Sequence, residues 1–214
     1  MQGIDLMVFD FDGTLVRSGK DLAASVNHTL KKLGLSVLPE DHIIGYIGDG
    51  VNKLIARSLG DAFPGKFDEA LSIFMDYYEE HLLDTTDLYP GVIEVLEHFK
   101  SKKKVIITNK LYTFTLKMTD ELNITGFFDE IIGMDSREFN KPDARLILPI
   151  IKKSRTEVRR TVVIGDGDND VLLAKNAGTI SCALLNGLGS REKLLALQPD
   201  YQCEDIRILT EVFF

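Results

Sequence analysis

Two aspartates one residue apart close the first apolar run of this 214-residue chain. Asp10 and Asp12 follow the run Ile4 to Phe9, and Gly13 and Thr14 come directly after them. Two anionic side chains crowded this closely repel each other unless a positive group joins them. A divalent cation bound by carboxylate oxygens is one such group. For this stretch taken alone, an ordinary Asp-Gly turn with solvated acids is the alternative.

A second acidic stretch follows another buried run. Residues 161–164 (Thr-Val-Val-Ile) predict a strand, and the sequence Gly-Asp-Gly-Asp-Asn-Asp over 165–170 comes directly after it. A calcium loop of the EF-hand type is rejected for this stretch. Val171 stands where such a loop needs glycine, Ala177 stands where it needs a bidentate glutamate, and a strand precedes it. The acids Asp166 and Asp170 therefore fit better as partners of a cation or a lysine.

Two further polar residues, Thr108 and Lys141, are candidates for the same site. Thr108 closes the β-branched run 104–108 and is followed by Asn109 and Lys110, so that a hydroxyl and backbone amides are available to an anion. Lys141 lies in a Lys-Pro-Asp loop before a helical pattern. Each signal is weak alone, but together the four stretches supply two carboxylates, a hydroxyl, a lysine and metal-binding acids. That set is suited to phosphoryl transfer, where catalysis is mostly positioning and charge stabilisation.

The elements that must position these residues alternate between strand and helix. Apolar runs at 4–9, 104–108, 131–133, 161–164 and 180–184 predict strands, with helical patterns between them. Continuous apolar strands separated by helices indicate a parallel sheet covered on both faces. The sequence predicts an α/β fold, and it places the four stretches at the carboxyl ends of strands, where such sheets bind ligands.

Residues 16–84 depart from this alternation. Leu22, Val26 and Leu30 recur at helical spacing and Gly34 provides a stop, and three more helical patterns follow with no strand among them. The predicted organisation is a core of residues 1–15 and 85–214, interrupted by a helical domain over 16–84. In the core, Pro149 is expected to kink or divide a helix, Ser190 to cap one, and residues 206–214 to form a short one.

The amino-acid composition limits the classes of molecule that the protein is expected to bind. The net charge is −8, and the pI is about 5.1, which disfavours nucleic acid and anionic membranes as partners. Two cysteines are too few for a disulfide framework. No signal peptide or membrane span is predicted, so the expected location is the cytoplasm and the expected partner is a small phosphorylated metabolite. A monomer and a homodimer are both compatible with the sequence.

The four stretches, in this order, resemble the four motifs of the haloacid dehalogenase superfamily of phosphatases. The stretch 10–15 (Asp-Phe-Asp-Gly-Thr-Leu) resembles the first motif, Thr108 the second, Lys141 the third and residues 165–170 the fourth. The resemblance covers nearly the whole chain. It implies a Rossmann-like core, and it implies that residues 16–84 form the helical cap of the C1 type found in that superfamily.

The resemblance also implies roles. Asp10 would attack phosphorus and form an aspartyl-phosphate, and Asp12 would serve as general acid and then general base. Thr108, the Asn109 amide and Lys141 would stabilise the phosphoryl oxygens. Mg²⁺ would be held by Asp10, the backbone carbonyl of Asp12 and Asp166, with Asp170 in support. Because dehalogenases lack the acid at the position of Asp12, a phosphatase is favoured over a dehalogenase.

Within the superfamily the chain is most similar to phosphoglycolate phosphatase-like enzymes, which implies 2-phosphoglycolate as substrate. The similarity rests on the cap helix, the Thr-Asn-Lys stretch at 108–110 and a Gly-Asp-Gly stretch at 48–50. Arg17, Asn52 and Leu111 depart from that subgroup's pattern. The expected substrate-binding residues are Gly13, Asn109, Gly48, Asp49, Gly50, Lys53 and Arg57. A simple helix–helix turn is the alternative for 48–50.

Three other functions remain open. A phosphomutase of the β-phosphoglucomutase type shares all four motifs but would transfer the phosphoryl group to a second hydroxyl. A receiver-type signalling domain accepts phosphate without turnover, although its acceptor aspartate follows the third strand. A binding or scaffolding role on an inactive fold is the third alternative, yet every catalytic position is intact here.

Overall fold

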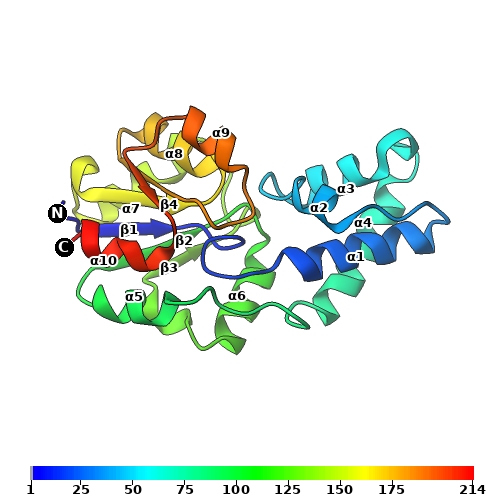
Figure 1. The fold of residues 1–214 in the computed structure, drawn as a ribbon, viewed down its shortest axis with the longest axis horizontal. Coiled ribbons are helices and arrows are strands. Elements are labelled where there is room, and N and C mark those ends of the chain that lie inside the picture. Colours follow the sequence, from blue (N-terminus) through cyan, green and yellow to red (C-terminus); the bar gives the residue numbers. More distant parts are fainter. Residues whose placement is uncertain (1) are drawn as a thin grey trace.

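A single six-stranded parallel sheet organises the molecule (Figure 1). The computed structural model describes residues 2–214. The strands are β1 (Leu6–Phe9), β2 (Lys103–Ile107), β3 (Glu130–Ile132), β4 (Thr161–Gly165), β5 (Ile180–Leu184) and β6 (Tyr201–Cys203). Their spatial order is β3-β2-β1-β4-β5-β6, so β1 lies between β2 and β4 near the centre. The predicted α/β fold with a parallel sheet is confirmed.

Both faces of β1 are buried, which explains its continuous apolar sequence. Met7 and Phe9 belong to the apolar cluster that includes residues of α5, α6 and α10, whereas Leu6 and Val8 pack in the cluster of α7 and α8. These helices cover opposite faces of the sheet (Figure 1). The α-helices are α1 (Gly19–Lys32), α2 (Glu40–Ile44), α3 (Val51–Leu59), α4 (Phe67–Glu80), α5 (Val92–His98), α6 (Tyr112–Glu121), α7 (Leu148–Ser154), α8 (Asp168–Ala177), α9 (Arg191–Ala196) and α10 (Leu209–Val212). Within residues 2–214, no helix is long and apolar enough to cross a membrane.

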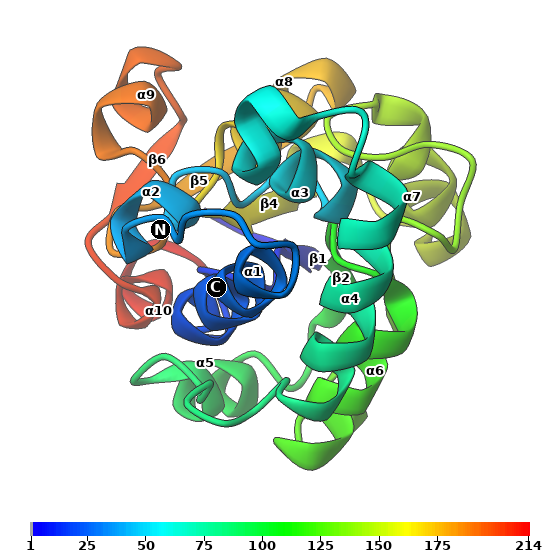
Figure 2. The ribbon, with the colours of Figure 1, turned by 90° about the vertical axis from the view of Figure 1, so that its right-hand side faces the viewer.

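Helices α1 to α4 form a separate group at the carboxyl ends of the strands. The arrow of β1 points toward them in Figure 1, and Figure 2 shows them in front of the sheet. Helix α1 packs against α2 and α4, and α3 packs against α4. Helix α1 ends as predicted before Gly34, whose φ of +69° is a left-handed conformation that glycine adopts without strain. Helices α1 to α4 therefore stand over the edge of the sheet where the motif residues gather.

Two chain segments connect this helical group to the sheet, and they are joined to each other. Val16 in the outgoing segment forms a bridge with Leu88 in the returning one, and Arg17 N donates to Asp87 O at 2.9 Å. The exposed side chains of Arg17 and Asp87 also form an ion pair. Arg17, a departure from the subgroup's pattern, therefore lies in this junction.

The buried carboxylate of Asp21 also holds the returning segment. It accepts hydrogen bonds from the backbone N–H and the hydroxyl of both Thr85 and Thr86, at 2.6 to 3.1 Å. Burial raises the pKa of Asp21, but these hydrogen bonds outweigh burial, and the net shift is downward. An ionised carboxylate on α1 thus fastens the return of the chain to the sheet.

Of the local predictions, one is wrong, and one strand was missed. The predicted division at Pro149 is confirmed: residues 144–146 form a 3₁₀ turn, and α7 begins anew at Leu148 with Pro149 in its first turn, where a missing N–H costs nothing. The predicted helix over 206–214 is a 3₁₀ turn at Ile206–Ile208 followed by α10, and the chain leaves the helix at Phe213. Strand β6 was not predicted. The cap at Ser190 is confirmed, since its side chain accepts a hydrogen bond from Lys193 N.

Candidate active site

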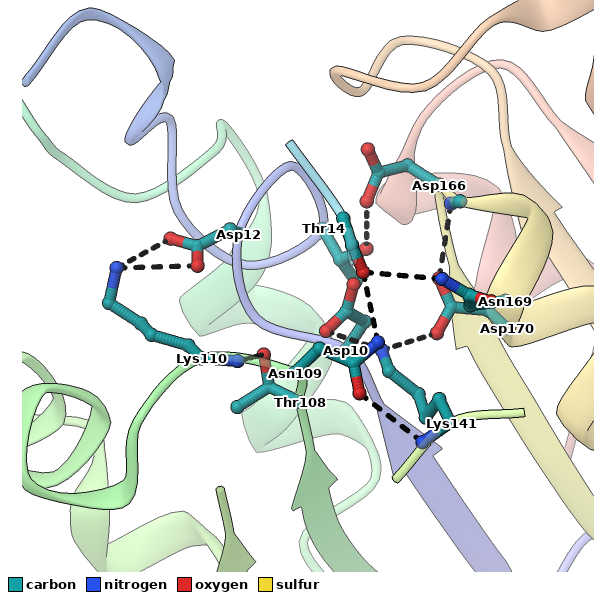
Figure 3. A network of polar contacts seen from close by, with 12 residues as sticks. Asp10, Asp12, Thr14, Thr108, Asn109, Lys110, Lys141, Asp166, Asn169 and Asp170 are labelled. Atoms are coloured by element: carbon teal, nitrogen blue, oxygen red, sulfur yellow. Dashed lines mark hydrogen bonds and ion pairs between the residues drawn. The ribbon is translucent and has the colours of Figure 1, made fainter. Parts of the chain in front are cut away.

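Asp10 is the first residue after β1 and is held at the sheet edge by its backbone. Its N–H donates to Ile164 O on β4 at 2.9 Å, which continues the pairing of the two strands by one residue. Its side chain points toward the polar cluster shown in Figure 3. Lys141 Nζ lies 2.7 Å from Asp10 Oδ1, yet that buried oxygen has no partner with hydrogen-bond geometry. Asp10 therefore presents a carboxylate oxygen that can bind another group.

Asp166 follows β4 and lies against the loop that leaves β1. Its carboxylate accepts hydrogen bonds from Thr14 Oγ1 at 2.8 Å and from the N–H groups of Leu188 and Gly189 at 2.7 and 3.1 Å. Gly13 permits this approach, because a Cβ there would lie 2.1 Å from Asp166 Oδ2. Burial and the charge of Asp10 raise the pKa of Asp166 to about 6.

Asp170, in the first turn of α8, shares Lys141 with Asp10. Lys141 Nζ donates to Asp170 Oδ1 at 2.6 Å, and Gly167 N donates to Oδ2 at 3.0 Å. Burial and the charge of Asp10 raise the pKa of Asp170 to about 8. Burial lowers the pKa of Lys141, but Asp10 and Asp170 outweigh burial and the net shift is upward. Lys141 is therefore a buried cation between two carboxylates.

These three acids fit a divalent metal ion. One carboxylate oxygen from each of Asp10, Asp166 and Asp170 lies within 4.8 Å of the other two. Oxygen ligands suit a hard cation such as Mg²⁺. Burial and the charge of Asp10 raise the pKa values of the other two acids despite the nearby Lys141, so a further positive charge would stabilise the ionised cluster. The Asp12 carboxylate points away from this cluster, so only its backbone carbonyl remains as the predicted fourth ligand.

Asp12 has different neighbours from Asp10. Its carboxylate accepts a hydrogen bond from Ser18 Oγ at 2.5 Å and contacts Lys110 Nζ at 3.1 and 3.3 Å. Lys110 is almost fully buried and also donates to Tyr78 Oη on α4 at 2.6 Å. Ser18, Tyr78 and Lys110 were not among the predicted site residues. The only sequence signal was the position of Lys110 directly after the Thr-Asn pair at the end of β2.

Thr108 and Asn109 lie at the end of β2, as predicted. The buried Thr108 hydroxyl accepts a hydrogen bond from Lys110 N at 3.2 Å. The Asn109 side chain makes two contacts: its Oδ1 accepts from Lys141 N at 3.2 Å, and its Nδ2 donates to Gly48 O at 2.9 Å. Asn109 therefore links the site lysine to the loop of the helical group.

That loop, residues 48–50, lies on the site. Asn169 Nδ2 donates to Asp49 Oδ1 at 2.9 Å and to Gly48 O at 3.3 Å. Lys53 and Arg57, predicted to reach the substrate, both pair with Asp49 instead; the Lys53 contact is 3.5 Å long. Arg57 still lines a polar cleft together with Asp10 and Lys141, whereas Lys53 does not line it.

Asp10 and Asp12 lie where two hollows meet. The first is the polar cleft, which holds Lys141 and the acids of the fourth motif. The second is a mostly apolar cavity between the end of β2 and helices α1, α3 and α4. The arrangement offers a metal and phosphate site on one side of the two acids and a compartment for an organic group on the other.

Comparison with known proteins agrees with this geometry. A family model described as haloacid dehalogenase-like hydrolase matches residues 7–184. A phosphoglycolate phosphatase of Aquifex aeolicus is 35% identical over 92% of this chain and 90% of that protein. A phosphoglycolate phosphatase of Agrobacterium fabrum is 31% identical over 98% and 92%, respectively. The crystal structure of a predicted phosphoglycolate phosphatase from Haemophilus somnus superimposes with a TM-score of 0.93 at 28% identity, covering 98% of this chain and 97% of that one.

Proposed function

The chain belongs to the haloacid dehalogenase-like hydrolase family and is a phosphatase, and on this premise we propose that it hydrolyses a small phosphate monoester, 2-phosphoglycolate first among them. The names of the two relatives support that substrate. The observation that carries the proposal is that the carboxylates of Asp10 and Asp12 have different neighbours. The Asp10 carboxylate lies beside Lys141 and two other acids. The Asp12 carboxylate contacts Ser18 and Lys110.

In the proposed reaction, Asp10 attacks phosphorus through a carboxylate oxygen, and the bond from phosphorus to the leaving oxygen breaks. Asp12 gives that oxygen a proton. Asp12 then removes a proton from the water that hydrolyses the aspartyl-phosphate, which returns Asp10 to its free carboxylate. Lys141, already 2.7 Å from Asp10, and the Thr108 hydroxyl stabilise the negative charge on the phosphoryl oxygens.

Mg²⁺ is the proposed cofactor, held by Asp10, Asp166 and Asp170 together with the Asp12 carbonyl. When bound, it neutralises charge on the phosphoryl group. Lys141 contacts both Asp10 and Asp170 and so limits the repulsion among the three acids. The oxygen cluster and the raised pKa values of Asp166 and Asp170 support this assignment.

Residues 16–84 are proposed to act as a cap domain over the site. Asn109 and Asn169 would hold the loop 48–50 against the core, and this contact would exclude water from Asp10. Because Lys53 and Arg57 both pair with Asp49, their proposed effect on substrate binding is through the position of that loop. If Lys53→Ala and Arg57→Ala both left KM and the order of preferred substrates unchanged, this role would be ruled out.

The test is release of inorganic phosphate from a panel of phosphorylated metabolites, with and without Mg²⁺ and with a chelator control. Mg²⁺-dependent hydrolysis, with 2-phosphoglycolate among the best substrates, is the expected result. Transfer from β-glucose 1-phosphate to a second sugar hydroxyl would identify a phosphomutase instead. A stable phosphoprotein without turnover would identify a phospho-acceptor domain.

A further inference from the structure

The apolar cavity beside Asp12 contains a single cation among its lining residues. Its walls are largely aliphatic and aromatic. They include Leu22, Val51, Leu54, Phe74, Leu111 and Phe114. Lys110 is the only lysine or arginine that lines it. The mechanism proposed above assigns no task to this lysine.

Lys110 is held in that wall by two partners from different parts of the fold. Its ammonium contacts the Asp12 carboxylate at 3.1 Å and donates to Tyr78 Oη at 2.6 Å, and it lies 4.6 Å from the centre of the Tyr78 ring. Burying an ammonium among apolar groups is unfavourable unless its hydrogen bonds are satisfied. Burial accordingly lowers the pKa of Lys110, and the charge of Asp12 opposes that shift. A buried ammonium in the wall of an apolar cavity therefore suggests a role for Lys110 in binding.

The proposed role of Asp12 determines which part of the substrate Lys110 can contact. A leaving oxygen that receives a proton from Asp12 must lie within hydrogen-bond distance of that carboxylate. Lys110 Nζ is 3.1 Å from the same carboxylate. Asp12 borders both hollows, and the polar cleft is the proposed place of the metal and the phosphoryl group, so the first carbon atoms of the leaving group enter the cavity that Lys110 borders. The cavity of about 60 Å³ has room for roughly four or five water-sized groups, which suits two or three carbons better than a sugar ring.

We propose that Lys110 is a specificity-determining residue that binds a carboxylate carried on the carbon next to the ester oxygen, with Tyr78 orienting its ammonium from the helical group. The proposal rests on the proposed function and names the part of the site that selects the substrate class, small phosphorylated 2-hydroxy acids. An ammonium has three N–H groups. One N–H of Lys110 can be shared by the two Asp12 oxygens and a second serves Tyr78, which leaves the third for a substrate oxygen. In apolar surroundings such a charged contact is strong.

The experiment compares two esters of nearly equal size, 2-phosphoglycolate and 2-hydroxyethyl phosphate, which differ in the charge of the leaving group. We measure kcat/KM for both with wild type, Lys110→Met and Lys110→Arg. The expected wild-type preference for the carboxylate falls at least about tenfold in Lys110→Met, or about 1.4 kcal/mol, and is partly restored in Lys110→Arg. Lys117→Met is the matched control, because Lys117 is an exposed lysine on α6 that contacts Glu79 O and lines neither hollow. The ratio of kcat/KM for the two esters in Lys117→Met should equal that of the wild type.

Each outcome has one meaning. If Lys110→Met slowed both esters by the same factor, Lys110 would act only through Asp12 and the proposal would be wrong. A wild type that hydrolysed both esters equally well would overturn it as well, while leaving the phosphatase function intact. Failure of the wild type to release phosphate from either ester or from the wider panel would instead count against the proposed function.

A second measurement needs no variant, in case Lys110→Met does not fold. Glycolate and ethylene glycol correspond to the two leaving groups, and both can be tried as competitive inhibitors of the wild type with a common chromogenic phosphate ester. Glycolate should inhibit at concentrations at least about tenfold lower, because it carries the carboxylate. Equal inhibition by the two compounds would contradict a carboxylate contact.

Discussion

At the scale of single residues, Asp10 and Asp12 show how surroundings give one residue type two tasks. Both follow β1, but the Asp10 carboxylate lies with Lys141, Asp166 and Asp170, whereas that of Asp12 lies with Ser18 and Lys110. The Asp10 carboxylate is placed to attack a phosphoryl group bound beside Lys141, and the Asp12 carboxylate borders the second hollow, where it can exchange a proton with the leaving oxygen and with water. The difference arises from which strand ends and loops each side chain meets.

Asp10→Asn is expected to abolish turnover without unfolding the protein. The amide is a poor nucleophile, so kcat should fall by at least about a thousandfold. The two side chains have almost the same size, and the substitution removes one charge from a crowded group of three acids, so the melting temperature should not drop. Phosphate release and thermal unfolding measured on the same preparation check both parts. Substantial phosphatase activity in the variant would exclude Asp10 as nucleophile.

Mg²⁺ is expected to stabilise the folded protein, because it binds the acid cluster only when the strand ends are assembled. At a concentration a hundred times its dissociation constant, the gain is about 2.7 kcal/mol, seen as a higher melting temperature. Asp166→Asn should lose most of this gain. Asp168→Asn is the control, because Asp168 is an exposed acid at the start of α8, two residues after Asp166, and lies outside the cluster. Equal gains in both variants would place the metal elsewhere.

At the scale of elements, the contact between α1 and residues 85–86 connects the helical group to the sheet. Asp21→Asn removes the charge that four donors of Thr85 and Thr86 share, and its amide N–H₂ faces donors instead of acceptors. We expect the free energy of unfolding to fall by about 2 kcal/mol. Asp87→Asn is the control, because its pair with Arg17 is exposed and should be worth less than about 1 kcal/mol.

The same contact predicts a pH dependence. The folded-state pKa of Asp21 is depressed, so its contribution is complete above the unfolded-state pKa of roughly 3.9 and is lost as pH falls through the folded value. The stability difference between wild type and Asp21→Asn should therefore persist at neutral pH and shrink below about pH 4. Denaturant titrations at several pH values test this. A difference that did not change with pH would mean that charge is not its cause.

Elements buried on both faces could be predicted from the sequence, because their apolar runs have no other explanation. Strands β1, β2 and β4 are of this kind, and Asp10, Asp12, Thr108 and Asp166 followed from their ends. Strand β6 could not be predicted, since Tyr-Gln-Cys is not an apolar run and its conformation depends on pairing with β5. Lys110 and Ser18 were missed for a related reason. A lysine in a loop becomes part of a site only through its partners, and those of Lys110 come from the loop after β1 and from α4.

At the scale of the whole molecule, the negative net charge of the protein repels its proposed substrate. The net charge is −8, so the long-range field repels a phosphate monoester, and only local cations such as Lys110 and Lys141 attract it. Raising the ionic strength from about 0.01 to 0.15 M shortens the screening length from roughly 30 to 8 Å. We expect kcat/KM for 2-phosphoglycolate to rise about twofold over this range at constant free Mg²⁺. A steep fall would show that local attraction dominates the encounter.

The central place of β1 has a consequence for how the protein is made. Of the six strands, β1 comes first in the chain, yet Leu6 pairs with Lys103 on one side and Thr161 on the other. The strand that precedes the proposed nucleophile has no neighbour until β2, near the middle of the chain, has been synthesised, and it lacks the second until β4 follows. Helices α1 to α4 contact mainly one another and can form during that interval, since local contacts form fastest. A nascent chain therefore has no working site until β4 has emerged.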